Sequence, residues 1–411
     1  MSGFRFIHAA DLHIDSPLIG LAGKSEVFAE RLDQASRQAF DNLVSLAQEG
    51  RCSFIVIAGD LFDGQWRDYH TGLFFLSRMR RLRDANVRVF IVLGNHDAEN
   101  RFARRLEFSD NVQVLSADKA QTLFLNDIQA AIHGRSFPRR DVTDDFAADY
   151  PQPIPGHFNI GVLHTALTGR QGHELYAPCA IEELANRGYD YWALGHVHAH
   201  EILSRNPYIV FPGNLQGRHV RESGPKGAAL VTVDDGHVVD FDHRPLDVIR
   251  WSLEQLNVDQ CTEFNAIGDL VRERLEELTY NADGRTLAVR LQISGHAPLH
   301  YEIVRREVQL DEEIRTVAQA VGDIWIERLE LNTSSPERNL PDPTIAGRLQ
   351  AIVDELSRGE DFRENASTIL KQIRRRIPQG VADEEFYQNL VEQLPKRIAE
   401  LAKATVVGGE E

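Results

Sequence analysis

Five short apolar runs in this chain each end in side chains that bind metal ions. A strand that is buried on both faces has such a sequence, and the ligands of open α/β sheets gather beyond the carboxyl ends of the strands. The chain is therefore predicted to form an α/β domain in which these segments lie at the carboxyl ends of the strands. They are Asp11-Leu12-His13, Gly59-Asp60-Leu61-Phe62-Asp63, Gly94-Asn95-His96-Asp97, His164 and Gly195-His196-Val197-His198.

The first 245 residues alternate between strand-like and helix-like stretches. The early alternation predicts right-handed crossovers and parallel pairing, whereas the later strands, with few helices between them, predict antiparallel pairing. We expect a mixed-sheet α/β domain over residues 1–245 with its helices outside. Helices are predicted at about 25–49, 68–85, 99–108 and 178–187, and strands at about 4–10, 53–58, 87–93, 111–115, 120–125, 128–133, 158–163, 190–194, 200–204, 208–211 and 227–233.

After about residue 250 the pattern changes to that of a smaller α+β unit, predicted over residues 250–335. Residues 286–294 and 324–331 alternate like strands, whereas 251–279, in part, and 300–308 have helical patterns. Beyond Pro341 and Pro343, residues 344–405 predict a largely helical tail.

Charge and cysteine content exclude some classes of protein. The formal net charge of −17 argues against a protein that coats nucleic acid, because such proteins are normally basic. The three cysteines, Cys52, Cys179 and Cys261, are too far apart for a disulfide framework or a thiolate zinc cluster. The first strand leads straight into Asp11 and no apolar stretch approaches the ~20 residues that span a bilayer, so we expect a cytoplasmic protein without a signal peptide.

The residue types of the five segments suit two hard or borderline divalent ions. Paired ions about 3.5–4 Å apart promote in-line displacement at phosphorus, and they need a bridging ligand. Asp60 is the best candidate for that bridge, because it follows the apolar run 54–58 and Gly59 allows a close approach of the backbone. Taken singly, an aspartate after a strand is more often a turn or cap residue, and a histidine is more often structural. Only the whole set favours a metal centre.

The set of motifs resembles that of the calcineurin-like metallophosphoesterase superfamily. Within it, Ala9–Leu18 and Phe211–His219 resemble the SbcD-type DNA repair nucleases, and most closely their YhaO-like branch. The resemblance spans residues 8–227 and is weaker for the small unit and for the tail. It implies an αββα sandwich with a small α+β capping domain and a helical C-terminal tail.

The resemblance also assigns site residues. It implies that Asp60 bridges two ions, typically Mn²⁺ in this group, and that a hydroxide between them attacks phosphorus in line. His96 would protonate the leaving oxygen, with either Asp97 or Asp63 orienting its imidazole; for Asp63 a simple turn carboxylate is an equal alternative. One ion would be held by Asp11, His13, Asp60 and His198, and the other by Asp60, Asn95, His164 and His196.

DNA is the substrate that the resemblance favours, as for an exonuclease or endonuclease subunit. Arg218 and His219 match the YhaO-like signature and are the best candidates for phosphate contacts. Other arginines near the motifs could also bind DNA phosphates, but solvated charge on helices and loops explains each of them equally well. Two alternatives remain: a small-molecule phosphodiesterase or nucleotide phosphatase, and a mainly structural adaptor. The other arginines are Arg101, Arg104, Arg105, Arg135, Arg139, Arg140 and Arg221.

Two protein partners follow from the same resemblance. The tail of SbcD-like proteins grips the coiled coil of an SbcC-type ATPase, and the family forms homodimers through helices outside the sheet. The alternative for each apolar stripe is packing within the chain's own core. The tail stripe is Ile345, Leu349, Ile352, Val353, Leu356, Leu390, Leu394, Ile398 and Leu401, and the candidate dimer residues are Leu73, Phe74, Phe75 and Leu76.

Overall fold

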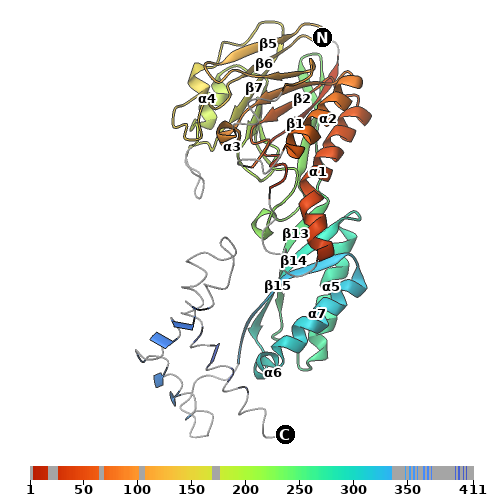
Figure 1. Ribbon diagram of the computed structural model, residues 1–411, viewed down its shortest axis with the longest axis vertical. Helices are drawn as coiled ribbons and strands as arrows, with labels where there is room; N and C mark the ends of the chain where they lie inside the picture. Colours follow the sequence, from red (N-terminus) through yellow and green to blue (C-terminus); the bar gives the residue numbers. More distant parts are fainter. Residues whose placement is uncertain are drawn as a thin grey trace. The chain divides into compact units, whose positions relative to one another are not determined.

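The computed structural model describes residues 3–16, 26–63, 69–100, 107–168 and 176–335, together with scattered residues between 348 and 404. The chain divides into two compact units (Figure 1). The first comprises Met1–Ser252 with Gly284–Ala288, and the second comprises Leu253–Asp283 with Val289–Glu411.

The first sheet of the first unit has the strand order β12-β11-β1-β2-β3-β4. Strands β1 to β4 run parallel to one another, and β11 and β12 extend the sheet antiparallel on the side of β1. Two helices, α1 (Glu26–Glu49) and α2 (His70–Asp84), lie beside this sheet (Figure 1). The strands are β1 (Phe4–Ala9), β2 (Phe54–Ala58), β3 (Arg88–Val92), β4 (Val112–Val114), β11 (Gly227–Asp234) and β12 (His237–Pro245).

The second sheet has the order β5-β6-β7-β8-β10-β9, with four parallel strands inside and an antiparallel strand at each edge. Two short helices, α3 (Asn95–Glu99) and α4 (Ile181–Asn186), belong to the same unit. The strands are β5 (Gln121–Leu125), β6 (Ala130–Gly134), β7 (Phe158–His164), β8 (Tyr191–Gly195), β9 (Glu201–Arg205) and β10 (Tyr208–Phe211).

Alternate side chains of the central strands enter different layers of the core. In β2, Ile55 and Ile57 pack with α1 and α2, whereas Phe54 and Val56 pack between the two sheets. On the far side of the second sheet, Trp192 packs with residues of α4 and of the segment 137–150. Three apolar layers therefore separate helix, sheet, sheet and helix, which confirms the αββα sandwich.

The second unit is built around a three-stranded sheet in the order β13-β14-β15. Helices α5 and α7 pack against each other, and α7 also contacts β15. Their buried residues, among them Val271, Leu275 and Ile314, supply the core of this unit. Its elements are the greater part of β13 (Ile249–Asn257) and of β14 (Thr286–His296), whose first residues belong to the first unit, together with α5 (Asn265–Tyr280), α6 (His300–Arg305), α7 (Glu307–Val321) and β15 (Ile324–Ser334).

Three element predictions differ from the structure. A fourth, the helix expected at 99–108, lies mostly outside the described residues, which omit 101–106; α3 ends at Glu99, and residues 107–109 are not helical. The start of the expected helical stretch 251–279 is instead part of β13, and α7 extends well past residue 308. Strand β12 was missed because it is an edge strand without a buried face, so its sequence lacks the apolar run that marks its neighbours.

Most of the predicted tail lies outside the described residues, including Ile345, Leu349, Val353 and Leu390. Five stripe residues are described: Ile352, Leu356, Ile398 and Leu401 are exposed, and Leu394 is partly buried. Among the described residues, no helix is long and apolar enough to cross a membrane.

We expect acid to destabilise the fold because two histidines are buried in it. Burial lowers the pKa of His8 to about 3 and that of His133 to about 4, from 6.5. Both therefore stay neutral in the folded chain below pH 6.5, whereas the unfolded chain takes up protons. The contribution of these two histidines to the free energy of unfolding is full above pH 6.5. It falls as the pH drops toward 4, by about 1.4 kcal/mol per pH unit for each group.

Urea unfolding between pH 7.5 and 4.5 checks this prediction. The His133→Gln variant removes one titrating group, so its free energy of unfolding should depend less steeply on pH than that of the wild type. Equal slopes for the two proteins would contradict the assignment.

Candidate metal centre

The loops that follow β1 and β2 run side by side and carry the first ligands. The backbone N–H of Asp11 donates to Gly59 O at 3.0 Å, and that of His13 donates to Asp60 O at 3.1 Å. Ile14 then forms an isolated parallel bridge with Phe62. The pairing of β1 and β2 thus continues beyond the strands and brings Asp11, His13 and Asp60 to the same edge of the sheet.

Four of the predicted ligands have left-handed backbone conformations. The φ angles are 51° for Asp11, 41° for His13, 53° for Asp60 and 100° for His196. Residues other than glycine seldom adopt positive φ, and each such residue costs on the order of 1–3 kcal/mol. Strain of this kind persists where the surrounding structure enforces it, and it gathers at functional sites.

Two glycines allow the strand ends to approach one another. A Cβ on Gly59, whose φ is 94°, would overlap Nδ1 of His164, and a Cβ on Gly195 would overlap the carbonyl oxygen of Ala58. The sequence prediction for Gly59 rested on this kind of close approach. The two glycines let β2, β7 and β8 converge on one point.

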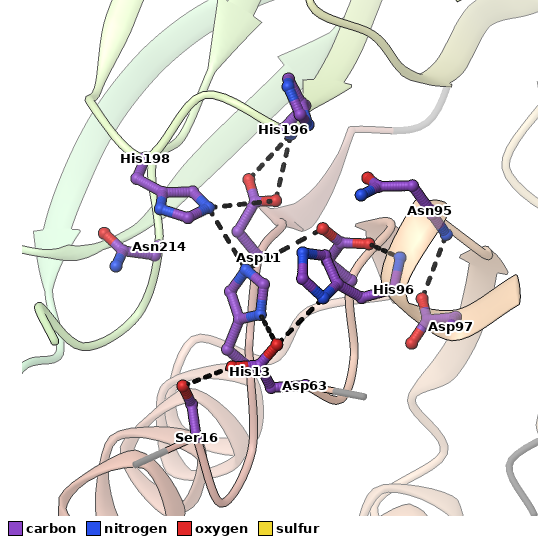
Figure 2. Close-up of polar contacts among 12 residues, drawn as sticks. Asp11, His13, Ser16, Asp63, Asn95, His96, Asp97, His196, His198 and Asn214 are labelled. Atoms are coloured by element: carbon purple, nitrogen blue, oxygen red, sulfur yellow. Dashed lines mark hydrogen bonds and ion pairs between the residues drawn. The ribbon is translucent and has the colours of Figure 1, made fainter. Parts of the chain in front are cut away.

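One ligand cluster consists of Asp11, His13 and His198 (Figure 2). The Nε2 atoms of His13 and His198 lie 3.2 Å apart, and Nε2 of His198 lies 3.8 Å from Oδ1 of Asp11. Oδ2 of Asp60 lies 3.9 Å from Nε2 of His13. Metal–ligand bonds of about 2.0–2.2 Å place neighbouring ligand atoms at such separations.

A second cluster consists of Asp60, His164 and His196, with Asn95 beside them. Nδ1 of His164 donates to the carbonyl oxygen of Ala58 at 2.9 Å, so Nε2 of the neutral ring carries a lone pair. That atom lies 2.9 Å from Oδ1 of Asn95 and 3.5 Å from Oδ2 of Asp60. Three acceptors at this distance need a cation or a proton among them.

The residues present therefore fit two divalent ions. All seven predicted ligands come together, they offer only imidazole nitrogen, carboxylate and amide oxygen, and Asp60 approaches both clusters. Asp11, Asp60 and His164 are at most 1% exposed. Buried carboxylates are normally paired with a cation, and the arrangement provides a place for one in each cluster.

The electrostatics of the cluster point the same way. Burial opposes the charge of His164, but the carboxylates of Asp60 and Asp11 outweigh it and raise the pKa of this histidine to about 9. Burial would likewise raise the pKa of Asp60, yet His164 holds it well below the usual range. The site attracts positive charge strongly enough to protonate a buried imidazole when nothing else supplies that charge.

His96 faces Asp63 across the edge of the site (Figure 2). Nδ1 of His96 lies 2.9 Å from Oδ1 of Asp63, and Ser16 donates to the other oxygen of this carboxylate at 2.7 Å. The hydrogen bond to Asp63 raises the pKa of His96. The pair leaves Nε2 of His96 as the atom that can exchange a proton, while Asp63 fixes the plane of the ring.

Asp97, the other residue considered for orienting His96, has different contacts. Its buried carboxylate accepts hydrogen bonds from the backbone N–H groups of Leu61, Phe62 and Gly94, at 3.0–3.2 Å. It therefore ties the loop after β2 to the loop after β3. Asp63, not Asp97, is the carboxylate that contacts the imidazole.

Replacing Asp97 with alanine should destabilise the fold, because it leaves three buried N–H groups without this acceptor. We expect a loss of about 2–4 kcal/mol in the free energy of unfolding, measured with urea in the presence of a metal chelator. The matched change Asp118→Ala, at an exposed position, should leave stability nearly unchanged. An Asp97→Ala protein as stable as the wild type would remove the structural role.

Arg218 lies beside the His13–His198 cluster, as the sequence predicted for a phosphate-binding residue. Its guanidinium lies 3.7 Å from Asp63 and 3.0 Å from Nδ1 of His198. His219 is half-exposed, with Nε2 3.7 Å from Glu222. Glu222, which the sequence prediction did not include, lies between these groups; only its position three and four residues after them could have drawn attention to it.

Two of the remaining arginines make contacts within the chain. Arg135 lies over the ring of Phe146 at 4.0 Å, and Arg139 donates to the backbone of Asp141. Arg101, Arg104 and Arg105 lie outside the described residues.

Comparison with known proteins places this geometry in a family. Residues 4–200 match the family model of the calcineurin-like phosphoesterases, the class that the αββα fold and the ligand set define. Residues 251–334 match the model of the middle domain of the metallophosphoesterase YhaO. The chain is 32% identical over 362 residues to the uncharacterized metallophosphoesterase YhaO of Bacillus subtilis, covering 86% of this chain and 88% of that protein. This chain therefore belongs to the YhaO-type metallophosphoesterases of the calcineurin-like family.

More distant relatives carry a name that refers to DNA. The chain is 23% identical to the DNA double-strand break repair protein Mre11 of Methanopyrus kandleri, over 61% of this chain and 58% of that protein. It is 32% identical to the Mre11 protein of Archaeoglobus fulgidus over 246 residues, 53% of this chain and 52% of that one.

Proposed function

We propose that this chain is a two-metal phosphodiesterase that hydrolyses DNA, with Mn²⁺ as its metal. The observation that carries the chemistry is the convergence of seven nitrogen and oxygen ligands on two adjoining clusters with the Asp63–His96 pair at their edge. The preference for Mn²⁺ rests on the donor set, which holds oxygen and imidazole and no thiolate.

Each group at the edge of the site has a separate task in this mechanism. When bound, two divalent ions polarise a phosphoryl oxygen and lower the pKa of a water molecule. His96, held through Nδ1 by Asp63, gives a proton from Nε2 to the departing oxygen. Arg218 supplies a fixed positive charge beside Asp63 and the metal ligand His198, so it can bind a non-bridging phosphate oxygen.

DNA is proposed as the substrate on three grounds. The Mre11 relatives are named for double-strand break repair, Arg218 and His219 lie within reach of the ligand clusters, and a phosphodiester backbone suits both. The acidic chain argues for contacts confined to this edge. Such binding would depend on few phosphate contacts and should weaken only moderately with salt.

Hydrolysis by the purified protein tests the proposal. With Mn²⁺ we expect cleavage of single- or double-stranded DNA that is abolished by a chelator. A protein that cleaves bis(p-nitrophenyl) phosphate but no DNA would be a small-molecule phosphodiesterase. A protein that binds both ions and cleaves neither would be an adaptor for another enzyme.

Two partners belong to the same proposal. A homodimer would use the outer side of α2, where Leu73 is 58% exposed. Phe75 is fully buried in the monomer and Phe74 packs against Arg78, so these two residues are not available for a contact between subunits. Light scattering of Leu73→Asp, which should give a monomer, tests this contact. An SbcC-like coiled-coil ATPase would bind the tail, and deletion of residues 344–411 should abolish that binding while hydrolysis persists.

A further inference from the structure

Glu222 ends the short 3-10 helix Val220–Glu222 and lies next to both a metal ligand and the predicted phosphate-binding residue. Its side chain is only 7% exposed. Oε1 lies 2.7 Å from Nδ1 of His198 and 3.0 Å from Nη2 of Arg218. Oε2 accepts hydrogen bonds from the backbone N–H of Arg218 at 2.8 Å and from Nδ2 of Asn214 at 2.9 Å.

The contact between Glu222 and His198 decides which ring nitrogen carries the proton. A carboxylate can only accept, so the 2.7 Å contact requires a proton on Nδ1 of His198. Nε2 of the neutral ring then keeps its lone pair, and this is the atom that faces His13 and Asp11. A ring with the proton on Nε2 could not bind an ion there.

Arg218 makes this choice necessary. Its Nη2 lies 3.0 Å from the same Nδ1 atom of His198 and can only donate. Without an acceptor at Nδ1, the guanidinium would favour the ring that carries its proton on Nε2. Oε1 of Glu222 accepts a hydrogen bond from Nδ1–H of His198 and pairs with the guanidinium of Arg218. It therefore favours the tautomer of His198 that can bind a metal ion through Nε2.

The backbone around Glu222 is held firmly by the rest of the first unit. Gln216 accepts from the N–H of Ile249 and donates to its carbonyl oxygen, and Trp251 donates from Nε1 to the carbonyl oxygen of Gly217 at 2.8 Å. Asn214 donates both to the carbonyl oxygen of Gln216 and to Glu222. The carboxylate therefore has little freedom to turn away from His198.

We propose that Glu222 is a positioning residue that sets His198 for metal binding and holds Arg218 beside it, so that one carboxylate couples an ion of the centre to the phosphate-binding group. This inference rests on the proposed function, since it concerns the same site. It differs from a merely structural role for Glu222, in which the residue would only close the loop through Asn214 and the backbone of Arg218.

Metal binding by Glu222→Gln tests the proposal. Glutamine has the same shape, but it lacks the negative charge and has an NH2 donor in place of one oxygen, so it cannot accept from His198 and the Arg218 guanidinium at one end and from Asn214 and the Arg218 backbone at the other. We expect isothermal calorimetry with Mn²⁺ to show one of two ions bound about 10–100-fold more weakly, with the other unchanged. The matched control is Glu183→Gln, on a solvent-exposed helix-capping glutamate, which should bind both ions as the wild type does. Wild-type affinity for both ions in Glu222→Gln would overturn the proposal.

A measurement on the wild type keeps the test valid if that variant fails to fold. Nitrogen-15 chemical shifts of the metal-free protein, assigned with His198→Gln, should show His198 with its proton on Nδ1. A ring protonated mainly on Nε2 would overturn the proposal. Neither readout needs a substrate, so a protein that shows both effects but cleaves no DNA would retain the role of Glu222 and lose the proposed substrate.

Discussion

Phosphodiester hydrolysis by Asp60→Asn should be slower than that of the wild type by about 10³-fold or more. The carboxylate of Asp60 approaches both clusters, 3.9 Å from Nε2 of His13 and 3.5 Å from Nε2 of His164. An amide lacks the charge and the second acceptor oxygen that a bridge between two cations needs. Losing several kcal/mol of charge stabilisation corresponds to a rate loss of that order. Initial rates at saturating Mn²⁺ measure it.

The control for Asp60→Asn is Asp127→Asn. Asp127 is an exposed aspartate that pairs with Arg88 at the opposite end of the strands from the ligands. Its replacement should change neither the rate nor the number of ions bound. The account would be contradicted if Asp60→Asn still bound two ions and hydrolysed at the wild-type rate.

Hydrolysis of DNA by His96→Asn should fall by about 10²–10⁴-fold while both ions still bind. His96 contacts Asp63 at 2.9 Å through Nδ1, and asparagine cannot transfer a proton to the leaving oxygen. The loss should be smaller for bis(p-nitrophenyl) phosphate, because nitrophenolate leaves readily without a proton. Comparing the two substrates in one set of rate measurements therefore separates proton donation from substrate binding.

The matched change His157→Asn controls for the loss of a histidine. His157 precedes β7, at the opposite end of that strand from His164, and should be replaceable without effect on rate. Equal losses of His96→Asn activity on both substrates would show that His96 binds the phosphate and does not donate a proton.

The sequence predicted the central strands of the first unit well because they are buried on both faces. Residues 54–58 are all buried, and such a run has few alternatives to a central strand. Strands β12 and β13 escaped prediction for the opposite reason, since the exposed face of each mixes polar and apolar residues and loses the pattern. The short helix α3 was not predicted, because its first turn is held by contacts to Asp60 and Asp97 and carries no helical periodicity.

The seven ligands were predictable as a set because each follows a strand, but three features of the site depend on contacts distant in sequence. The choice of Asp63 over Asp97 depends on the packing of the two loops against each other. The left-handed backbone of Asp11, His13 and His196 could not be read from residue type, because aspartate and histidine adopt it more often than most residues but usually have other conformations. Glu222 is 24 residues from His198, and only the fold brings the two together.

The most direct test of the two-metal centre is a crystal structure with Mn²⁺, with the ions located by their anomalous scattering. Two peaks are expected about 3.5–4 Å apart, with Asp60 between them. One should be bound by Asp11, His13 and His198, and the other by Asn95, His164 and His196. A single peak, or peaks away from Asp60, would contradict the account.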